Sequence, residues 1–176
     1  VQKLFDNEQF FLQIDCHMRM VKNWDSHLIA LLNQTPDPLK AVLTCYPSAY
    51  SLDQSFEEQQ QIDQAPLCMV FTHFSQEDGL PRFKSTKILR NQEIITKPFA
   101  SYFWAAGFSF SYGTLVTDCP YLAEFEEVFF GEEHLQIYQM WQKNYKLYTP
   151  HMPVCSHLWQ KSHRGESLYK SLNEIK

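Results

Sequence analysis

Phe10-Phe11-Leu12-Gln13-Ile14-Asp15-Cys16-His17 joins an apolar, strand-like run to two potential metal ligands. The apolar run predicts a buried strand over residues 10–14. Asp15 and His17 follow its carboxyl end, where open α/β sheets bind their ligands. Side chains two residues apart point the same way from an extended backbone, so we expect Asp15 and His17 to face one cation while Cys16 points away. An ordinary strand-end Asp beside a surface His would give the same pattern, so other residues must distinguish these interpretations.

Two further groups of polar residues lie near the end of the chain, in Gly131-Glu132-Glu133-His134 and in Val154-Cys155-Ser156-His157. The first group opens a run with helical spacing, which predicts a helix over 132–143. Glu132 and Glu133 are candidates for a functional site, although acidic residues at this position also stabilise the helix dipole. His157 is either a third metal ligand or a hydrogen-bonded histidine between core strands.

The composition is that of a globular, acidic protein of 176 residues, 44% of them hydrophobic. This length fits a single domain over residues 1–176. The net charge of −5 argues against nucleic acid as a partner, because nucleic-acid binding needs a basic surface to neutralise phosphates. No run approaches the ~18 apolar residues of a membrane helix, so we expect no membrane segment. The five cysteines are widely spaced, which favours reduced thiols and a cytoplasmic location.

Predicted strands and helices are intermixed along the chain, which indicates an α/β fold with a mixed sheet. Apolar runs predict strands over 41–46, 67–71, 82–89 (an edge strand), 146–149 and 154–159. Helical spacing predicts a helix over 22–34. We expect a polar surface connection over 52–64 and a helical tail from Ser162 onward. Gly107, within the aromatic stretch 99–112, indicates a bend or a place where a ligand approaches the backbone.

A series of motifs resembles the glycosyltransferase family that adds N-acetylglucosamine to a hydroxyproline of a cytoplasmic ubiquitin-ligase adaptor. The first runs from Gln13 to Arg19, is followed by Trp24-Asp25, and is close to the family's QIDSHMRF and WD, with Cys16 in place of Ser. The later matches are Ala106-Gly107-Phe108-Ser109-Phe110-Ser111, Phe129-Phe130-Gly131-Glu132-Glu133, Trp141, Tyr145, Tyr148, Pro150 and His157-Leu158-Trp159. The related polypeptide N-acetylgalactosaminyltransferases show a parallel order of Asp-x-His, a Gly-rich segment, a Gly-Glu motif and a late His.

This resemblance implies the GT-A fold, a Rossmann-type mixed sheet flanked by helices. It also implies a retaining transferase that uses Mn²⁺ or another divalent cation. The donor would be a UDP-sugar, with GlcNAc as the sugar, and the acceptor a protein or peptide hydroxyl. By the same resemblance, the metal ligands are Asp15, His17 and His157.

The resemblance further implies the residues that contact the donor. Glu132 is expected to hydrogen-bond the sugar hydroxyls at the catalytic centre, with Glu133 as the alternative for this role. The expected donor-sugar residues are Arg19, Trp104, Ala106, Gly107 and Phe108. In this set, Gly107 lets the backbone approach the sugar, the aromatic rings wall the pocket and the arginine pairs with a phosphate. Core packing for the aromatic rings and a surface salt bridge for the arginine are the structural alternatives.

In the GT-A fold, the first β-α-β half carries the uridine site and precedes the metal motif. We therefore expect residues 1–176 to be an N-terminally incomplete portion of the catalytic domain. One alternative function is an inactive domain that binds a glycan or a protein; unlike a transferase, it would not need Asp15, His17 and a metal. Another is a metal-dependent hydrolase with Glu133 or His134 as its general base.

Overall fold

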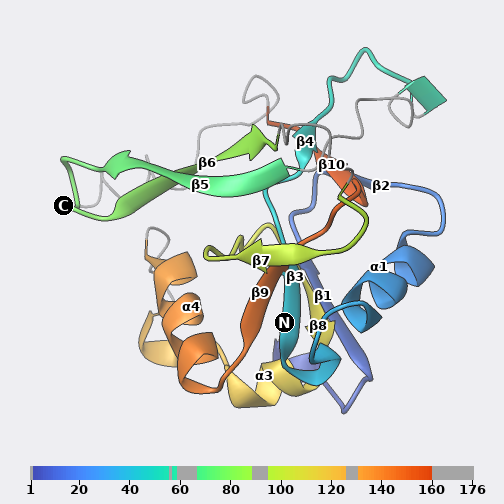
Figure 1. Cartoon of the computed structure of the whole chain (residues 1–176). Coiled ribbons are helices and arrows are strands. Elements are labelled where there is room, and N and C mark those ends of the chain that lie inside the picture. Colours follow the sequence, from blue (N-terminus) through green and yellow to red (C-terminus); the bar gives the residue numbers. More distant parts are fainter. Residues whose placement is uncertain (1, 56, 59–66, 89–94, 126–130, 160–176) are drawn as a thin grey trace.

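The structure is a computed structural model that describes residues 2–55, 57–58, 67–88, 95–125 and 131–159 (Figure 1). The predicted tail from Ser162 lies outside these residues, as does most of the predicted connection over 52–64. The strands are β1 (Phe10–Ile14), β2 (Met18–Met20), β3 (Ala41–Thr44), β4 (Ser48–Ala49), β5 (Leu67–Phe74), β6 (Pro81–Lys87), β7 (Phe99–Ser101), β8 (Phe108–Tyr112), β9 (Lys146–Thr149) and β10 (Cys155–His157). The helices are α1 (Trp24–Asn33), α3 (Thr114–Asp118) and α4 (Glu132–Gln142), with short 3₁₀ helices at Gln2–Leu4, Pro38–Lys40 and Ala123–Phe125.

The main sheet has the strand order β1-β8-β3-β9-β7. Its pairings are antiparallel except between β3 and β9, which are parallel. The mixed sheet expected from the sequence is therefore confirmed. In the β1–β8 register Ile14 pairs with Phe108, so the end of β1 lies beside the residues that precede β8.

Helices cover both faces of this sheet, with α1 on one side and α3 and α4 on the other (Figure 1). The side chains of β3 alternate between the two faces, as expected for a strand. Leu43 packs with Leu28 of α1 in one core cluster, whereas Val42 packs with Trp104 and Met140 in the other. Burial on both faces explains why the sequence of β3 is an unbroken apolar run rather than an alternating one.

A smaller sheet and a separate ribbon complete the described part of the chain. The small sheet has the order β2-β10-β4, and β10 runs antiparallel to β2 and parallel to β4. Strands β5 and β6 form a two-stranded antiparallel ribbon. The contacts of the ribbon with the rest of the molecule include those of Phe83, whose ring centroid lies 4.2 Å from that of Phe103 and 5.4 Å from that of His134. On its strand β5, Phe71 and Phe74 are exposed.

None of the helices in the described ranges is both long enough and apolar enough to cross a membrane.

We predict that Leu28→Ala lowers the free energy of unfolding by about 2–5 kcal/mol, because Leu28 is fully buried and its loss leaves a cavity between α1 and the sheet. Leu39→Ala is the matched control. Leu39 is 59% exposed, and we expect this second substitution to cost only about 0.5 kcal/mol. Urea denaturation followed by circular dichroism measures both. Equal losses for the two variants would contradict the packing of α1 described above.

Candidate metal centre

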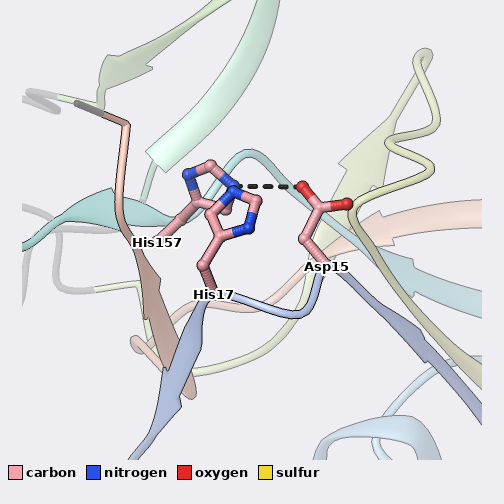
Figure 2. Close-up of side chains that lie close together, drawn as sticks. All are labelled: Asp15, His17 and His157. Atoms are coloured by element: carbon pink, nitrogen blue, oxygen red, sulfur yellow. Dashed lines mark hydrogen bonds and ion pairs between the residues drawn. The ribbon is translucent and has the colours of Figure 1, made fainter. Parts of the chain in front are cut away.

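Asp15, His17 and His157 meet where the main sheet adjoins the small one (Figure 2). Asp15 follows β1, His17 precedes β2 and His157 ends β10. One ligand atom from each residue lies within 4.8 Å of the other two. Nε2 of His157 is 3.0 Å from Oδ2 of Asp15, and the ring centroids of His17 and His157 are 4.3 Å apart. One carboxylate and two imidazoles form a mixed ligand set that suits a divalent first-row cation.

The three candidate ligand residues differ in their access to solvent. His157 is only 2% exposed, because β10 lies between the other two strands of the small sheet. The side chain of Asp15 is 47% exposed. The buried imidazole therefore lies at the inner side of the cluster, and a cation can approach from the side of the carboxylate.

Backbone hydrogen bonds hold all three ligand residues. The N–H of Asp15 donates to the carbonyl of Gly107 (3.1 Å), and the N–H of Leu158 donates to the carbonyl of His17 (3.2 Å). The carbonyl of His157 accepts from the N–H of Tyr50 (3.2 Å). These constraints act on the main chain, and the contact between His157 Nε2 and Asp15 Oδ2 adds a direct link between the side chains.

The local backbone around the motif differs from the expectation of an extended strand. Cys16 and His17 form a turn between β1 and β2, so Asp15 and His17 are brought together by the turn and not by strand alternation. The Cys16 thiol does not point away from the motif, because its Sγ atom lies 3.4 Å from Nδ1 of His17. The reason is that β2 pairs with β10 and not with the main sheet, so the chain must change direction after β1.

Gly107 is in close contact with the metal cluster. A Cβ atom at this position would lie 2.8 Å from Oδ2 of Asp15, which is closer than real Cβ contacts. The absence of a side chain therefore makes room for the Asp15 carboxylate. Thr44 fixes the same turn, because its hydroxyl accepts from the N–H of Ala105 (2.8 Å) and donates to the carbonyl of Phe108 (3.0 Å).

Trp104 and Phe108 flank this turn, but both side chains belong to the core. They are 2% and 0% exposed and lie in the clusters on opposite faces of the main sheet. The indole N–H of Trp104 donates to Oγ of Ser109 (2.9 Å). In this structure the two rings do not present a wall to a sugar, which differs from the expectation, and the core alternative describes them better. The physical reason is that helices cover both faces of the sheet, so that Phe108 packs into the cluster on one face and Trp104 into the cluster on the other.

The two glutamates at the start of α4 point to different neighbours. Glu133 accepts from the backbone N–H of Ala106 (3.0 Å) and from the hydroxyl of Tyr46 (2.9 Å). Burial raises the pKa of Glu133, and the negative charge of Asp15 adds to this effect. Glu132 accepts from the hydroxyl of Tyr121, so the two carboxylates differ in their hydrogen-bond partners.

A cavity of about 980 Å³ opens beside Glu132, along one side of β1 and between α3 and α4. Its lining includes Gln13 and Tyr121, whose side chains hydrogen-bond to each other (2.9 Å). The amide of Gln13 also donates to the carbonyl of Ala106 (2.9 Å), which connects the cavity wall to the turn beside Asp15. The polar groups of this wall are suited to bind hydroxyl groups.

Arg19 lies on β2 and is engaged by protein groups. Its guanidinium donates to the carbonyl of Gln54 (2.9 Å) and lies over the ring of Tyr50, 4.1 Å from the centroid. The arginine thus has partners other than a phosphate in this structure.

Sequence reasoning did not identify Tyr46 or Tyr121 as site residues. Each donates its hydroxyl to one of the α4 glutamates, and neither belongs to a recognisable motif. The available signal was position, because Tyr46 lies two residues after the end of the buried strand β3, near the same edge of the sheet as Asp15, which directly follows β1.

We predict that Gly107→Ala weakens Mn²⁺ binding by at least about tenfold, because the added methyl group displaces the Asp15 carboxylate. The free energy of unfolding should change by less than about 1 kcal/mol, since a side-chain end can move without disturbing the fold. Electron paramagnetic resonance of free Mn²⁺ measures the affinity, and urea denaturation measures the stability.

Gly79→Ala is the control for this variant. It should lower the free energy of unfolding but leave Mn²⁺ binding unchanged. Gly79 has φ 70° and open space around it, so alanine strains the backbone by about 1–2 kcal/mol but leaves the metal cluster unchanged. Wild-type Mn²⁺ affinity in Gly107→Ala would contradict the role of the Asp15 carboxylate as a ligand.

The model of the glycosyltransferase (GlcNAc) family matches residues 1–172. None of the curated proteins compared matches the chain. Among solved structures, the chain is similar to a crystal structure of GalNAc-T7 with UDP, GalNAc and Mn²⁺, with a TM-score of 0.61 at 14% identity.

The alignment with GalNAc-T7 covers 99% of this chain and 34% of that chain, so this chain spans about a third of the length of its structural neighbour. At this identity the likeness concerns the fold, and it confirms the expected GT-A architecture. The family model, in contrast, covers nearly the whole sequence. The protein therefore belongs to the glycosyltransferase (GlcNAc) family.

Proposed function

We propose that the chain is the metal-bearing part of a single catalytic domain that transfers GlcNAc from UDP-GlcNAc to a protein hydroxyl, such as that of hydroxyproline, with retention of configuration. The observation that carries this proposal is the cluster of Asp15, His17 and His157 at the end of β1, in a member of a glycosyltransferase family. The structural neighbour GalNAc-T7 was solved with UDP, GalNAc and Mn²⁺, which agrees with a metal and a UDP-sugar.

The ligand set defines what the protein contributes at the metal centre. Asp15 supplies a negative oxygen, and His17 and His157 supply neutral nitrogens when their free lone pairs face the ion. A bound divalent cation such as Mn²⁺ would neutralise the negative charge that develops on a departing nucleotide diphosphate. The buried position of His157 keeps this ligand oriented before any ion binds.

The start of α4 and the turn beside it supply the groups proposed to bind the donor sugar. Glu132 faces the cavity together with Gln13 and Tyr121, and this set offers acceptors and donors to sugar hydroxyls. Glu133 instead fixes the main chain at Ala106, next to Gly107. We therefore assign sugar binding to Glu132 and support of the turn to Glu133, with a direct sugar contact of Glu133 as the alternative.

The acceptor and the location of the protein rest on the sequence resemblance. A hydroxyproline acceptor and a cytoplasmic location follow from the similarity of the Gln13–Arg19 motif to that of the hydroxyproline GlcNAc-transferases. The five free cysteines agree with a reducing compartment, and three of them (Cys45, Cys119 and Cys155) are buried. For Arg19 to contact a phosphate, its guanidinium must leave the carbonyl of Gln54 and the ring of Tyr50.

Titration calorimetry with Mn²⁺, with and without UDP-GlcNAc, tests the metal and the donor. We expect the wild-type chain to bind Mn²⁺ and UDP-GlcNAc to tighten that binding. Asp15→Asn should weaken Mn²⁺ binding by about tenfold or more, since it removes a charged ligand. Asp25→Asn is the matched control, because Asp25 lies in the first turn of α1 away from the cluster. UDP-GalNAc in place of UDP-GlcNAc tests the choice of sugar.

Transfer to synthetic peptides tests the acceptor. Peptides that differ only in hydroxyproline, proline, serine or threonine are incubated with UDP-GlcNAc and Mn²⁺, and the anomeric configuration of the product is read by NMR. If neither this chain nor a longer form that carries any residues preceding Val1 binds Mn²⁺ or UDP-GlcNAc, the transferase function is refuted. That result would favour a glycan- or protein-binding role.

A further inference from the structure

Trp159 lies directly against the metal cluster and has no role in the function proposed above. Its ring centroid is 4.0 Å from that of His157, with an angle of 49° between the ring planes. His157 in turn contacts His17 and hydrogen-bonds to Asp15. The imidazole of His157 is therefore bounded by the indole on one side and by the other two metal ligands.

The indole is itself fixed in position. Its Nε1–H donates to the carbonyl of Pro47 (3.0 Å), although the residue as a whole is 44% exposed. A hydrogen bond and ring contacts thus hold a side chain that solvent would otherwise leave mobile. Tyr46 meets the indole in an edge-to-face arrangement, with centroids 5.9 Å apart and planes at 76°. Such aromatic pairs are favourable beyond the area that they bury.

Tyr46 continues this set of contacts to α4. Its hydroxyl donates to Oε2 of Glu133, and burial raises the pKa of this hydroxyl, so it remains a donor. Oε1 of the same carboxylate accepts from the N–H of Ala106 (3.0 Å). The carbonyl of the next residue, Gly107, accepts a hydrogen bond from the backbone N–H of Asp15.

These contacts form a closed ring that returns to the metal cluster. In order, its members are His157, Trp159, Tyr46, Glu133, Ala106, Gly107 and Asp15. Asp15 and His157 are 142 positions apart in the sequence, yet the ring joins them both directly and through α4. A displacement of one member is opposed from both sides.

We propose that Trp159 is a positioning residue of the metal centre, which holds the His157 ring toward Asp15 and, through Tyr46, ties that ring to Glu133. The proposal rests on the proposed function in one respect, because it takes Asp15 and His157 as metal ligands. Groups that orient a ligating histidine contribute strongly to metal affinity. Trp159 differs from the usual case by acting through a tilted ring contact in place of a hydrogen bond.

Trp159→Leu tests this role through two readouts on the intact chain. In electron paramagnetic resonance titrations, we expect Mn²⁺ binding to weaken by about tenfold. In metal-free protein labelled with ¹⁵N-histidine, the wild-type His157 ring should show the nitrogen shifts of one fixed tautomer. In the leucine variant these shifts should become averaged. Trp159→Phe keeps a ring in place and should restore Mn²⁺ binding to within about threefold of wild type.

Tyr46→Leu tests the connection to Glu133. It should weaken Mn²⁺ binding by about threefold, and its effect should be less than additive with that of Trp159→Leu, because both act on the same ring contact. Trp141→Leu is the matched control. Trp141 is 62% exposed on α4, so the same chemical change there should leave both readouts unchanged.

The two readouts separate the positioning role from the transferase function. Wild-type Mn²⁺ affinity and an unchanged His157 spectrum in Trp159→Leu would overturn the positioning role and leave the metal centre intact. If the wild type does not bind Mn²⁺ but Trp159→Leu still averages the His157 shifts, orientation by Trp159 is supported and the metal-dependent function is lost. Equal losses in Trp141→Leu would overturn the proposal by showing a general effect of removing an indole.

Discussion

The close approach of the Asp15 carboxylate to the main chain at Gly107 is the constraint on which the site depends. The pairing of β1 with β8 brings these residues together, and only a residue without Cβ leaves room for the carboxylate. The same turn carries the N–H that holds Glu133 and the carbonyl that holds Gln13. The backbone at Ala106 and Gly107 therefore supports the candidate metal site, Glu133 and the cavity wall at Gln13 together.

Charge explains why a cation suits this arrangement. Asp15, Glu132 and Glu133 place negative groups around the end of β1, and both burial and the neighbouring carboxylates raise the pKa of Glu133. Like charges in such proximity oppose one another, and a divalent ion relieves this repulsion. In the described residues, the Ala106 N–H and the Tyr46 hydroxyl donate to Glu133, the Tyr121 hydroxyl donates to Glu132, and Nε2 of His157 lies 3.0 Å from Oδ2 of Asp15.

Periodicity was sufficient to predict several elements, although not β2, β4 or α3, and it did not predict the contacts between elements. The strand over 10–14 has the bounds expected, and the helices predicted over 22–34 and 132–143 form over Trp24–Asn33 and Glu132–Gln142. In contrast, Tyr46 and Glu133 are 87 positions apart, and no local pattern indicates that they meet. Core packing of Trp104 and Phe108 was one of two alternatives that the sequence left open, because the choice depends on helices that cover both faces of the sheet. The turn at Cys16 and His17 arises from pairing with the distant strand β10.

The β5–β6 ribbon is expected to unfold locally more often than the main sheet. A two-stranded ribbon is only marginally stable in water by itself, so this one depends on contacts with the rest of the molecule, such as those of Phe83 with Phe103 and His134. The main sheet, by comparison, is covered on both faces and opens only when the fold is lost. Amide hydrogens of the ribbon should therefore exchange with deuterium long before those of β3 and β8. Strands β5 and β6 would therefore separate and pair again many times while the core of the main sheet stays folded.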